Sequence, residues 1–459
     1  MNVIRLSQGE RLAPEQLPRQ GVLPAHIMEA AQRIVDEVRL RGDDALREFC
    51  LKFDRVESET FAVDSAAMDD AIERVDPTFL EALGKAAGQI RDFHERERSQ
   101  SWFTTRADGT MLGVKVTPVR SAGIYVPGGR AQYPSTVLMN AIPAKVAGVD
   151  RVVMVTPPQK EGGISPYTLA AAKVAGVDEI YAVGGAQAIA ALAYGTESIP
   201  RVAKITGPGN AYVAAAKRIV SGDAGIDMVA GPSEVCVLVD ASADATVVAA
   251  DLMAQAEHDP LAACYLVTCD EAFAERVQER IGFLLESSPR EQITRESLDN
   301  QGVVVVAPDM KIAVDAVNTI APEHLELHCA DAFALLGSIQ NAGAIFVGPW
   351  SSEPLGDYVA GPNHTLPTGG TAAFSNPLSV EDFVKRSSVV AYTPAGLAAD
   401  GPAAQTLAQA EGLWAHALSV GLRRTLIESG RASLDDLVLD DVGAIAWPEA
   451  LDAPRGEGV

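Results

Sequence analysis

The sequence predicts an α/β protein with two doubly wound α/β domains, an extended N-terminal arm and a small C-terminal helical domain. Three observations support this fold class. Short β-branched runs alternate with Ala-rich helical stretches through the middle of the chain, which is typical of βαβ units around parallel sheets. Hydrophobic residues make up 47% of the 459 residues and aromatic residues only 5%, a mixture that suits helices packed on sheets. A Gly/Pro-rich stretch over 349–379 then precedes late helices.

The first part of the chain is polar and then helical. Residues 1–23 are largely polar, are interrupted by Pro14 and Pro18, and are expected to form the extended arm. Apolar residues at spacings of three and four predict amphipathic helices over Pro24–Phe53 and Pro77–Glu97. Partial alternation predicts a strand over Met111–Val119.

Two series of strand–helix alternation follow, and each predicts one Rossmann-like unit. The first series has strands at Arg151–Thr156, Glu179–Val183 and Val202–Ile205, with helices at 165–175, 185–194 and 210–220. The second has strands at Val235–Val239, Ala263–Val267 and Val303–Ala307, with helices at 243–257, 271–286 and 310–319. A further helix is expected over Ala403–Ser429.

The expected domain boundaries follow from these patterns. They are 1–23 for the arm, 24–120 together with 236–375 for the first α/β domain, 121–235 for the second, and 376–459 for the C-terminal helical segment.

Charge and composition exclude some partners and compartments. The net charge of −24 would repel a phosphate backbone, so no nucleic-acid partner is expected. No apolar core of a secretory signal follows the first residues, and no uninterrupted apolar stretch approaches the length of a membrane span, so no membrane partner is expected either. The five cysteines are scattered without a Cys-x-x-Cys pair, which indicates reduced thiols and a cytoplasmic location.

Two clusters of polar residues contain candidate ligands and acid–base groups. Gln255 and His258 lie three apart near the end of an expected helix, so they share a face and can both bind Zn²⁺. The alternative is a cationic histidine that stabilises a helix C-terminus. Glu323 and His324 are adjacent bases of different strength, suited to proton transfer. His324 and His328 would pair on a metal only in a helix, whereas the surrounding alternation favours a strand or turn, or a solvated strand edge.

Two further clusters lie late in the chain. Asp357 offers a hard oxygen ligand inside the Gly/Pro-rich stretch, where His364 can instead be structural. Glu411 and His416 lie five apart in the expected late helix, off a common helical line. Taken alone, that pair is more simply a surface glutamate and a packing histidine.

Glycine-rich segments occur at three expected strand–helix junctions: 126–129, 184–187 and 206–210. A helix N-terminus such as that after Asn210 can receive a phosphate or another polar group of a nucleotide. The chain has no Gly-x-Gly-x-x-Gly or P-loop at these positions, and each segment alone is more often a tight turn.

Taken together, the segments resemble the histidinol dehydrogenase family. Nine segments carry the resemblance, in register: Tyr125-Val126-Pro127-Gly128-Gly129, Gly184-Gly185-Ala186-Gln187-Ala188-Ile189, Gly207-Pro208-Gly209-Asn210, Ala230-Gly231-Pro232-Ser233-Glu234, Gln255-Ala256-Glu257-His258, Pro322-Glu323-His324-Leu325, Gly356-Asp357-Tyr358, Gly361-Pro362-Asn363-His364-Thr365-Leu366-Pro367-Thr368-Gly369-Gly370 and Glu411-Gly412-Leu413-Trp414-Ala415-His416. No single segment is decisive, but all nine in order are specific to this family.

The resemblance implies a role for each matched residue. The implied zinc ligands are Gln255, His258, Asp357 and His416. Glu323 and His324 match the acid–base pair, and Tyr125, Gln187 and Asn210 match the NAD contacts. The implied substrate contacts are Ser233, Gln255, His258, His324, Asp357, Glu411 and His416.

The resemblance also implies an activity and an assembly. The activity is a zinc-dependent, two-step NAD-linked oxidation of L-histidinol to L-histidine through histidinaldehyde, with one Zn²⁺ per subunit. The assembly is a homodimer in which the late helical segment reaches the partner's active site. The nearest rival is a related zinc-dependent dehydrogenase of another chelating alcohol or diol, and a zinc hydrolase or a non-catalytic binding protein would be a different class.

Overall fold

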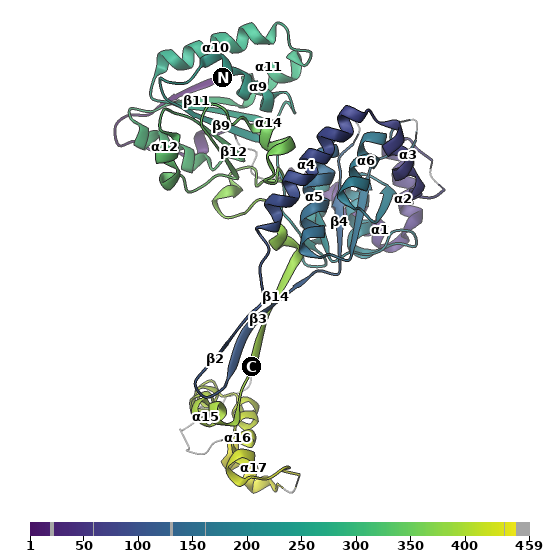
Figure 1. Ribbon diagram of the computed structural model, residues 1–459, viewed down its shortest axis with the longest axis vertical. Coiled ribbons are helices and arrows are strands. Elements are labelled where there is room, and N and C mark those ends of the chain that lie inside the picture. The colour runs from purple at the N-terminus through teal and green to yellow at the C-terminus, as the bar shows by residue number, and fades with distance from the viewer. Residues whose placement is uncertain (19–22, 58, 129–131, 161, 436, 447–459) are drawn as a thin grey trace. The chain divides into compact units, whose positions relative to one another are not determined.

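The computed structural model describes residues 1–18, 23–57, 59–128, 132–160, 162–435 and 437–446. The chain divides into two compact units (Figure 1). The first comprises Met1–Arg98 with Pro118–Val384, and the second comprises Ser99–Thr117 with Lys385–Val459. Gly129 of the first expected junction and residues 447–459 of the expected C-terminal segment lie outside the described residues.

A six-stranded, wholly parallel sheet forms one half of the first unit. Its order is β1 (Asn2–Arg5), β11 (Gly302–Val306), β10 (Ala263–Thr268), β9 (Glu234–Val239), β12 (His324–His328) and β13 (Ala344–Val347). Cys236 and Leu238 of β9 face a core that includes α12 (Met310–Ile320), whereas its Val235 and Val237 face α9 (Ala245–Ala256) and α10 (Glu271–Leu285). Because helices cover both faces, the sheet is doubly wound as predicted.

The first residues of the chain belong to this sheet. Asn2 to Arg5 pair in parallel with Val303 to Val306 at the sheet edge. The expected N-terminal arm is therefore extended, but its first residues are an integral edge strand.

A five-stranded parallel sheet forms the other half of the first unit. Its order is β6 (Glu179–Ala182), β5 (Arg151–Thr156), β4 (Ser121–Tyr125), β7 (Lys204–Thr206) and β8 (Gly225–Ile226). Helices α5 (Pro134–Ala147) and α6 (Pro166–Ala175) cover one face, and α7 (Gly185–Tyr194) and α8 (Ala211–Val220) cover the other. The strand order reverses between β4 and β7, where open parallel sheets commonly bind ligands.

The early helices pack on the five-stranded sheet, which corrects one expected boundary. Helix α1 (Ala25–Arg41) buries Ile34 and Val35 in the same core as α7, and α4 (Pro77–Glu95) shares its core with α5. The assignment of residues 24–120 to the domain of 236–375 was therefore wrong. An amphipathic pattern shows which face of a helix is apolar, but not which sheet that face covers.

The helix expected over Pro24–Phe53 is interrupted. Gly42, with φ +54°, ends α1, and α2 (Asp43–Phe49) begins directly after it. Such a left-handed conformation favours glycine.

The remaining short elements and helices of the first unit are η1 (Pro14–Gln16), η2 (Cys50–Asp54), α3 (Ala66–Arg74), α11 (Glu291–Gln301), α13 (Ala332–Leu335), η3 (Leu336–Ser338), α14 (Glu353–Leu355), η4 (Gly356–Ala360), η5 (Thr371–Ala373) and η6 (Val380–Phe383).

The second unit combines a small sheet with helices. The strands are β14 (Val384–Ala391), β3 (Met111–Pro118) and β2 (Trp102–Thr105), and the helices are α15 (Pro394–Ala410), α16 (Trp414–Ser429) and α17 (Leu439–Ala446). The single helix expected over Ala403–Ser429 is thus two helices, separated by a turn in which Gly412 has φ +72°. Among the described residues, no helix is long and apolar enough to cross a bilayer.

Candidate active site

The acid–base pair lies where β12 begins, beside the start of β9. Glu323 directly precedes β12, and His324 is its first residue, paired in register with Val235. The backbone N–H of Glu234 donates to Glu323 Oε2 at 2.8 Å, and the carbonyl oxygen of Glu234 lies 3.0 Å from His324 Nδ1. Both side chains are buried. One strand residue therefore orients both groups and places the His324 Nδ1 proton against its carbonyl.

Two carboxylates from the Gly/Pro-rich stretch over 349–379, here called the long loop, face the other ring nitrogen of His324. Asp357 Oδ1 lies 3.5 Å from His324 Nε2, and Glu353 Oε1 lies 3.9 Å from it. The loop is anchored by the Glu353 N–H, which donates to Glu326 Oε1 at 2.7 Å, and by His364 Nδ1, which lies 3.0 Å from the Asp357 carbonyl. His364 thus contacts the backbone of the residue that carries the predicted ligand. Glu353 was not singled out from the sequence, although it is the only other acid between 349 and 379 besides Asp357.

The electrostatics of this cluster favour a bound positive charge. Burial raises the pKa of Glu323 to about 8. Burial also opposes the imidazolium of His324, but the charges of Glu323, Asp357 and Glu353 outweigh it and raise the pKa of His324 to about 10. For Asp357, burial is outweighed by its hydrogen bond with His324 and by neighbouring histidines, so its pKa falls to about 2. A cation that binds here would compete with the proton of His324, which couples cation binding to release of that proton.

Gln255, in the last turn of α9, and His258, two residues after the helix ends, lie at the same end of the six-stranded sheet. Gln255 is buried, and its Oε1 has no hydrogen-bond partner among the described residues. Desolvation lowers the pKa of His258 despite the opposing charge of Asp357, which favours the neutral imidazole that a metal requires. Three of the four predicted metal ligands therefore come from the segments that surround His324.

A second buried cluster lies one turn back along α9 and further along β12. His328 Nε2 is 3.3 Å from Glu326 Oε2 and 3.6 Å from Asp251 Oδ2. Residues 324–328 form a strand, so the alternation correctly favoured a strand or turn over a helix. The alternative of a solvated strand edge was wrong, because β12 is buried between β9 and β13. His328 therefore joins this cluster and not that of His324. The other carboxylate oxygen of Glu326 binds Glu353, so the second cluster supports the loop that carries Asp357.

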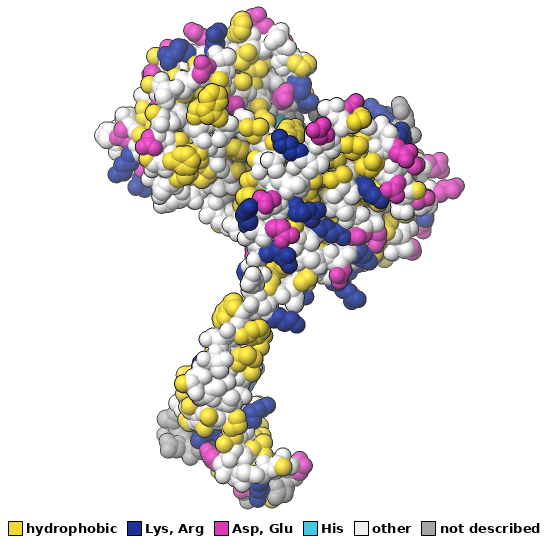
Figure 2. Space-filling view, viewed as in Figure 1, with side chains coloured by type: hydrophobic (Ala, Val, Ile, Leu, Met, Phe, Trp, Pro, Cys, Tyr) yellow, Lys and Arg dark blue, Asp and Glu magenta, His cyan; other side chains and the backbone are white. Residues whose placement is uncertain are grey.

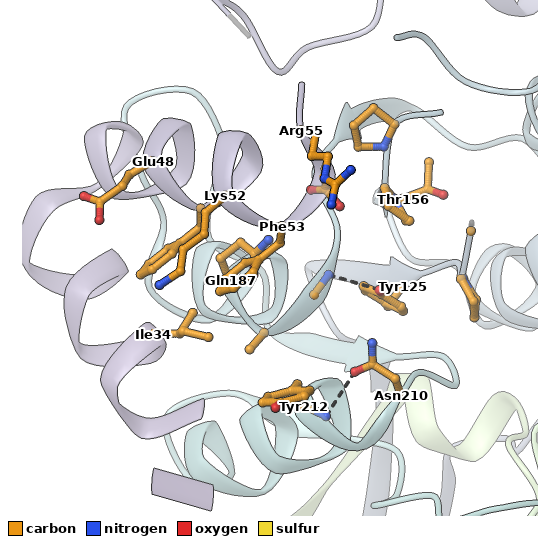
Figure 3. A pocket seen from close by; sticks show the side chains of 18 of the residues that line it. Ile34, Glu48, Lys52, Phe53, Arg55, Tyr125, Thr156, Gln187, Asn210 and Tyr212 are labelled. Carbon is orange, nitrogen blue, oxygen red and sulfur yellow. Dashed lines mark hydrogen bonds between the residues drawn. The ribbon is translucent and has the colours of Figure 1, made fainter. Parts of the chain in front are cut away.

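The predicted NAD contacts surround a cavity of about 1910 Å³ at the carboxyl ends of the five-stranded sheet (Figure 3). The Gly185 N–H, in the first turn of α7, donates to the Tyr125 hydroxyl at 3.1 Å. Asn210 caps α8 by accepting hydrogen bonds from the Tyr212 and Val213 N–H groups. Gln187 of α7 lines the same cavity. The cavity thus combines two helix N-termini with polar side chains, an arrangement suited to a phosphate-bearing ligand.

The remaining predicted residues are placed separately. Ser233 immediately precedes β9, and its carbonyl oxygen accepts the Ala263 N–H at 3.0 Å. Glu411 is the C-cap of α15 and His416 lies on α16, and both are exposed on the second unit. They are therefore not on the segments that form the His324 cluster.

Together, these features define a two-site α/β enzyme, with an acid–base cluster on one sheet and a large polar cavity on the other. The family model described as histidinol dehydrogenase matches residues 17–424. Histidinol dehydrogenase of Pseudomonas putida is 52% identical over 405 residues, covering 87% of this chain and 92% of the relative. Histidinol dehydrogenase of Halalkalibacterium halodurans is 51% identical over 394 residues, covering 86% of this chain and 93% of the relative.

A solved structure agrees with these relatives. The crystal structure of histidinol dehydrogenase from Elizabethkingia anophelis matches with a TM-score of 0.88 at 34% identity, covering 93% of this chain and 99% of that one. The chain therefore belongs to the histidinol dehydrogenase family, whose members are oxidoreductases that act on histidinol in histidine biosynthesis. Membership implies an NAD-linked dehydrogenase, as the sequence predicted.

Proposed function

We propose that this enzyme oxidises L-histidinol to L-histidine in two NAD-linked steps through histidinaldehyde, with one zinc ion per subunit. The observation that carries the proposal is the buried pair Glu323 and His324, oriented by the backbone of Glu234 and faced by Asp357. The relatives' names support histidinol as the substrate and disfavour the rival dehydrogenase of another alcohol.

Zinc would be held by Gln255, His258, Asp357 and His416. The unpartnered Oε1 of buried Gln255, the low pKa of Asp357 and the lowered pKa of His258 fit a divalent cation. When bound, zinc would supply Lewis-acid chemistry and fix the amino alcohol through its nitrogens. The set contains nitrogen and oxygen donors and no thiolate, a chemistry that zinc accepts.

The two oxidations use the acid–base pair in turn. NAD⁺, when bound, would supply a hydride acceptor for each of the two oxidations. In the first step, His324 Nε2 would accept the hydroxyl proton of the alcohol. In the second, Glu323 would accept a proton from the water that adds to the aldehyde, so that the hydrate can be oxidised to the carboxylate. Tyr125, Gln187 and Asn210 would bind NAD, and Ser233 and Glu411 would contact the substrate along with the zinc ligands and His324.

We propose further that the active enzyme is a cytoplasmic homodimer, in which Glu411 and His416 complete the partner's site. The second unit exposes apolar side chains such as Trp102 (55%), Leu407 (65%) and Trp414 (45%), and the face in Figure 2 shows apolar side chains over β2, β3 and β14. Exposed apolar patches of this kind commonly mark protein interfaces. All five cysteines are free, which fits a reducing compartment.

The first test is the ratio of NADH formed to L-histidinol consumed by the zinc-loaded enzyme. We expect two NADH per histidinol, with activity lost on chelation and restored by zinc. In Glu323→Gln, which keeps the shape of the side chain but removes the base, NADH formation from histidinaldehyde should fall about 100-fold or more. A folded, zinc-loaded enzyme that does not oxidise histidinol would contradict the proposal.

The shared site is tested by mixing two variants that are both impaired in the oxidation of histidinaldehyde, Glu323→Gln and His416→Ala, and measuring that step. If His416 acts in the partner's site, each mixed dimer contains one intact site, so random reassociation restores about one quarter of wild-type activity. If both residues act within one subunit, every mixed dimer has two damaged sites and the mixture stays impaired.

A further inference from the structure

A buried ion pair holds the loop that leads to Asn210, one of the residues that line the cavity of the five-stranded sheet. It joins Lys217 on α8 to Asp227, which follows β8, and the exposed fractions of the two side chains are 2% and 0%. Lys217 Nζ also donates to the Gly207 carbonyl oxygen at 2.9 Å, and Asp227 Oδ2 accepts the Gly207 N–H at 2.8 Å. The pair therefore holds both the N–H and the C=O of one loop residue.

Gly207 sits where the loop touches β4. Its φ is +110°, and a Cβ built there would lie 2.1 Å from the Tyr125 carbonyl oxygen. The loop thus packs closely against the backbone of Tyr125, whose hydroxyl accepts a hydrogen bond from the Gly185 N–H at the start of α7. Three residues later Asn210 caps α8. Any displacement of Gly207 would move Asn210 and the N-terminus of α8 relative to Tyr125.

The pair also anchors the helix that follows the loop. Lys217 lies seven residues after Asn210, about two turns along α8, so it fixes the loop and the helix to a single point. Burying two charges is costly, and apolar side chains could fill the same space equally well. Apolar side chains could not, however, form hydrogen bonds with the Gly207 N–H and C=O, and these bonds fix the path of the loop.

We propose that Lys217 and Asp227 are positioning residues for the dinucleotide. They hold residues 207–210 so that Asn210 and the N-terminal N–H groups of α8 meet the cofactor in the cavity. The inference rests on the proposed NAD site, and it assigns to two residues outside the nine matched segments a role in cofactor affinity.

The test compares Lys217→Met and Asp227→Asn with the wild-type enzyme, all loaded with zinc. We expect the KM for NAD⁺, and the Kd of NAD⁺ by calorimetry, to rise about tenfold, as for the loss of about 1.4 kcal/mol of binding free energy. The KM for histidinol should stay within about twofold of wild type, because the acid–base cluster lies on the other sheet. Lys217→Arg, which keeps the charge, should recover part of the NAD⁺ affinity.

The matched control is Lys204→Met. Lys204 pairs with Asp382 at 3.1 Å from the opposite end of β7, so this variant loses an ion pair without touching the loop. We expect a lower Tm but an unchanged KM for NAD⁺.

Two results would overturn the inference. The first is a set of Lys217 and Asp227 variants that lower Tm but bind NAD⁺ like wild type, which would make the pair merely structural and leave the proposed function intact. The second is a wild-type enzyme that does not bind NAD⁺ at all, which would remove the proposed dinucleotide site and the inference with it. If Lys217→Met does not fold, the milder Asp227→Asn, which keeps an acceptor for the Gly207 N–H, decides between these results.

Discussion

The two parallel sheets of the first unit carry their candidate residues at opposite ends. In the five-stranded sheet, Tyr125 ends β4 and Asn210 follows β7, so the cavity lies at the carboxyl ends of the strands. In the six-stranded sheet, Ser233 precedes β9 and Glu323 precedes β12, so the acid–base cluster lies at the amino ends. Open α/β sheets usually bind ligands at their carboxyl ends, and only the five-stranded sheet follows that rule.

The difference has a direct electrostatic consequence. Helices α7 and α8 begin at the cavity and present N–H groups, the positive end of the helix dipole. Helix α9 ends at the other site and presents carbonyl groups, the negative end, and His258, just after this end, interacts electrostatically with Asp357 and His324. One sheet therefore favours an anionic diphosphate, and the other favours a metal ion and a cationic amino alcohol.

The largest expected effect follows from removing the charge that attracts the cation. In Asp357→Asn the carboxylate with the lowered pKa is lost, so zinc content should fall and kcat should drop about 1000-fold, equivalent to roughly 4 kcal/mol of barrier. NAD⁺ affinity should not change, because the cavity lies on the other sheet. Metal analysis, steady-state kinetics and calorimetry with NAD⁺ measure these three quantities.

The matched control is Glu257→Gln, which removes a neighbouring carboxylate that is not in the ligand set. It should retain zinc and lose less than about threefold in kcat. Equal losses in both variants would mean that overall negative charge, and not a specific ligand, holds the cation.

An effect of intermediate size is expected on the pH dependence of the free energy of unfolding. Burial, together with the charge of Glu326, raises the pKa of Asp251 to about 7 in the folded state. The folded protein therefore holds a proton that the unfolded chain releases near pH 4, so the stability contributed by Asp251 is fully present below that pH and is lost as pH rises through 7. Asp251→Asn, which cannot ionise, should lessen this fall by about 2 kcal/mol, as measured by urea unfolding at pH 5 and pH 8. A parallel pH dependence in both proteins would show that Asp251 is ionised throughout.

The smallest effect concerns the cap of α8. Asn210→Ala removes the acceptor for two N–H groups at the cavity, which costs about 1 kcal/mol and should raise the KM for NAD⁺ about fivefold. The KM for histidinol should be unaffected. Asp244→Ala removes an equivalent cap from α9, at the end remote from Gln255, and should lower Tm without changing the KM for NAD⁺. A change in histidinol KM for Asn210→Ala would show that the two sheets do not act independently.

Much of the fold was readable in the sequence because it depends on local patterns. The alternation of β-branched and Ala-rich runs predicted both parallel sheets. The alternation around Leu325 favoured a strand or turn over a metal-binding helix, and the segment is a strand. The nine matched segments named the family, and the comparisons confirmed it. Side chains adjacent in sequence, such as Glu323 and His324, were recognisable as a pair without any structure.

Other features depend on contacts between distant segments, which no local pattern encodes. The packing of α1 and α4 on the five-stranded sheet, and of β1 at the edge of the six-stranded one, was decided by tertiary burial. Glu353 became a candidate only when the loop placed it near His324, and Lys217 and Asp227 only when they were seen to hold Gly207. The residue types and their order were determined by the sequence alone. Which end of each sheet they occupy, and hence which sign of charge each site favours, was decided by the tertiary structure, because helix direction and strand order orient the dipoles.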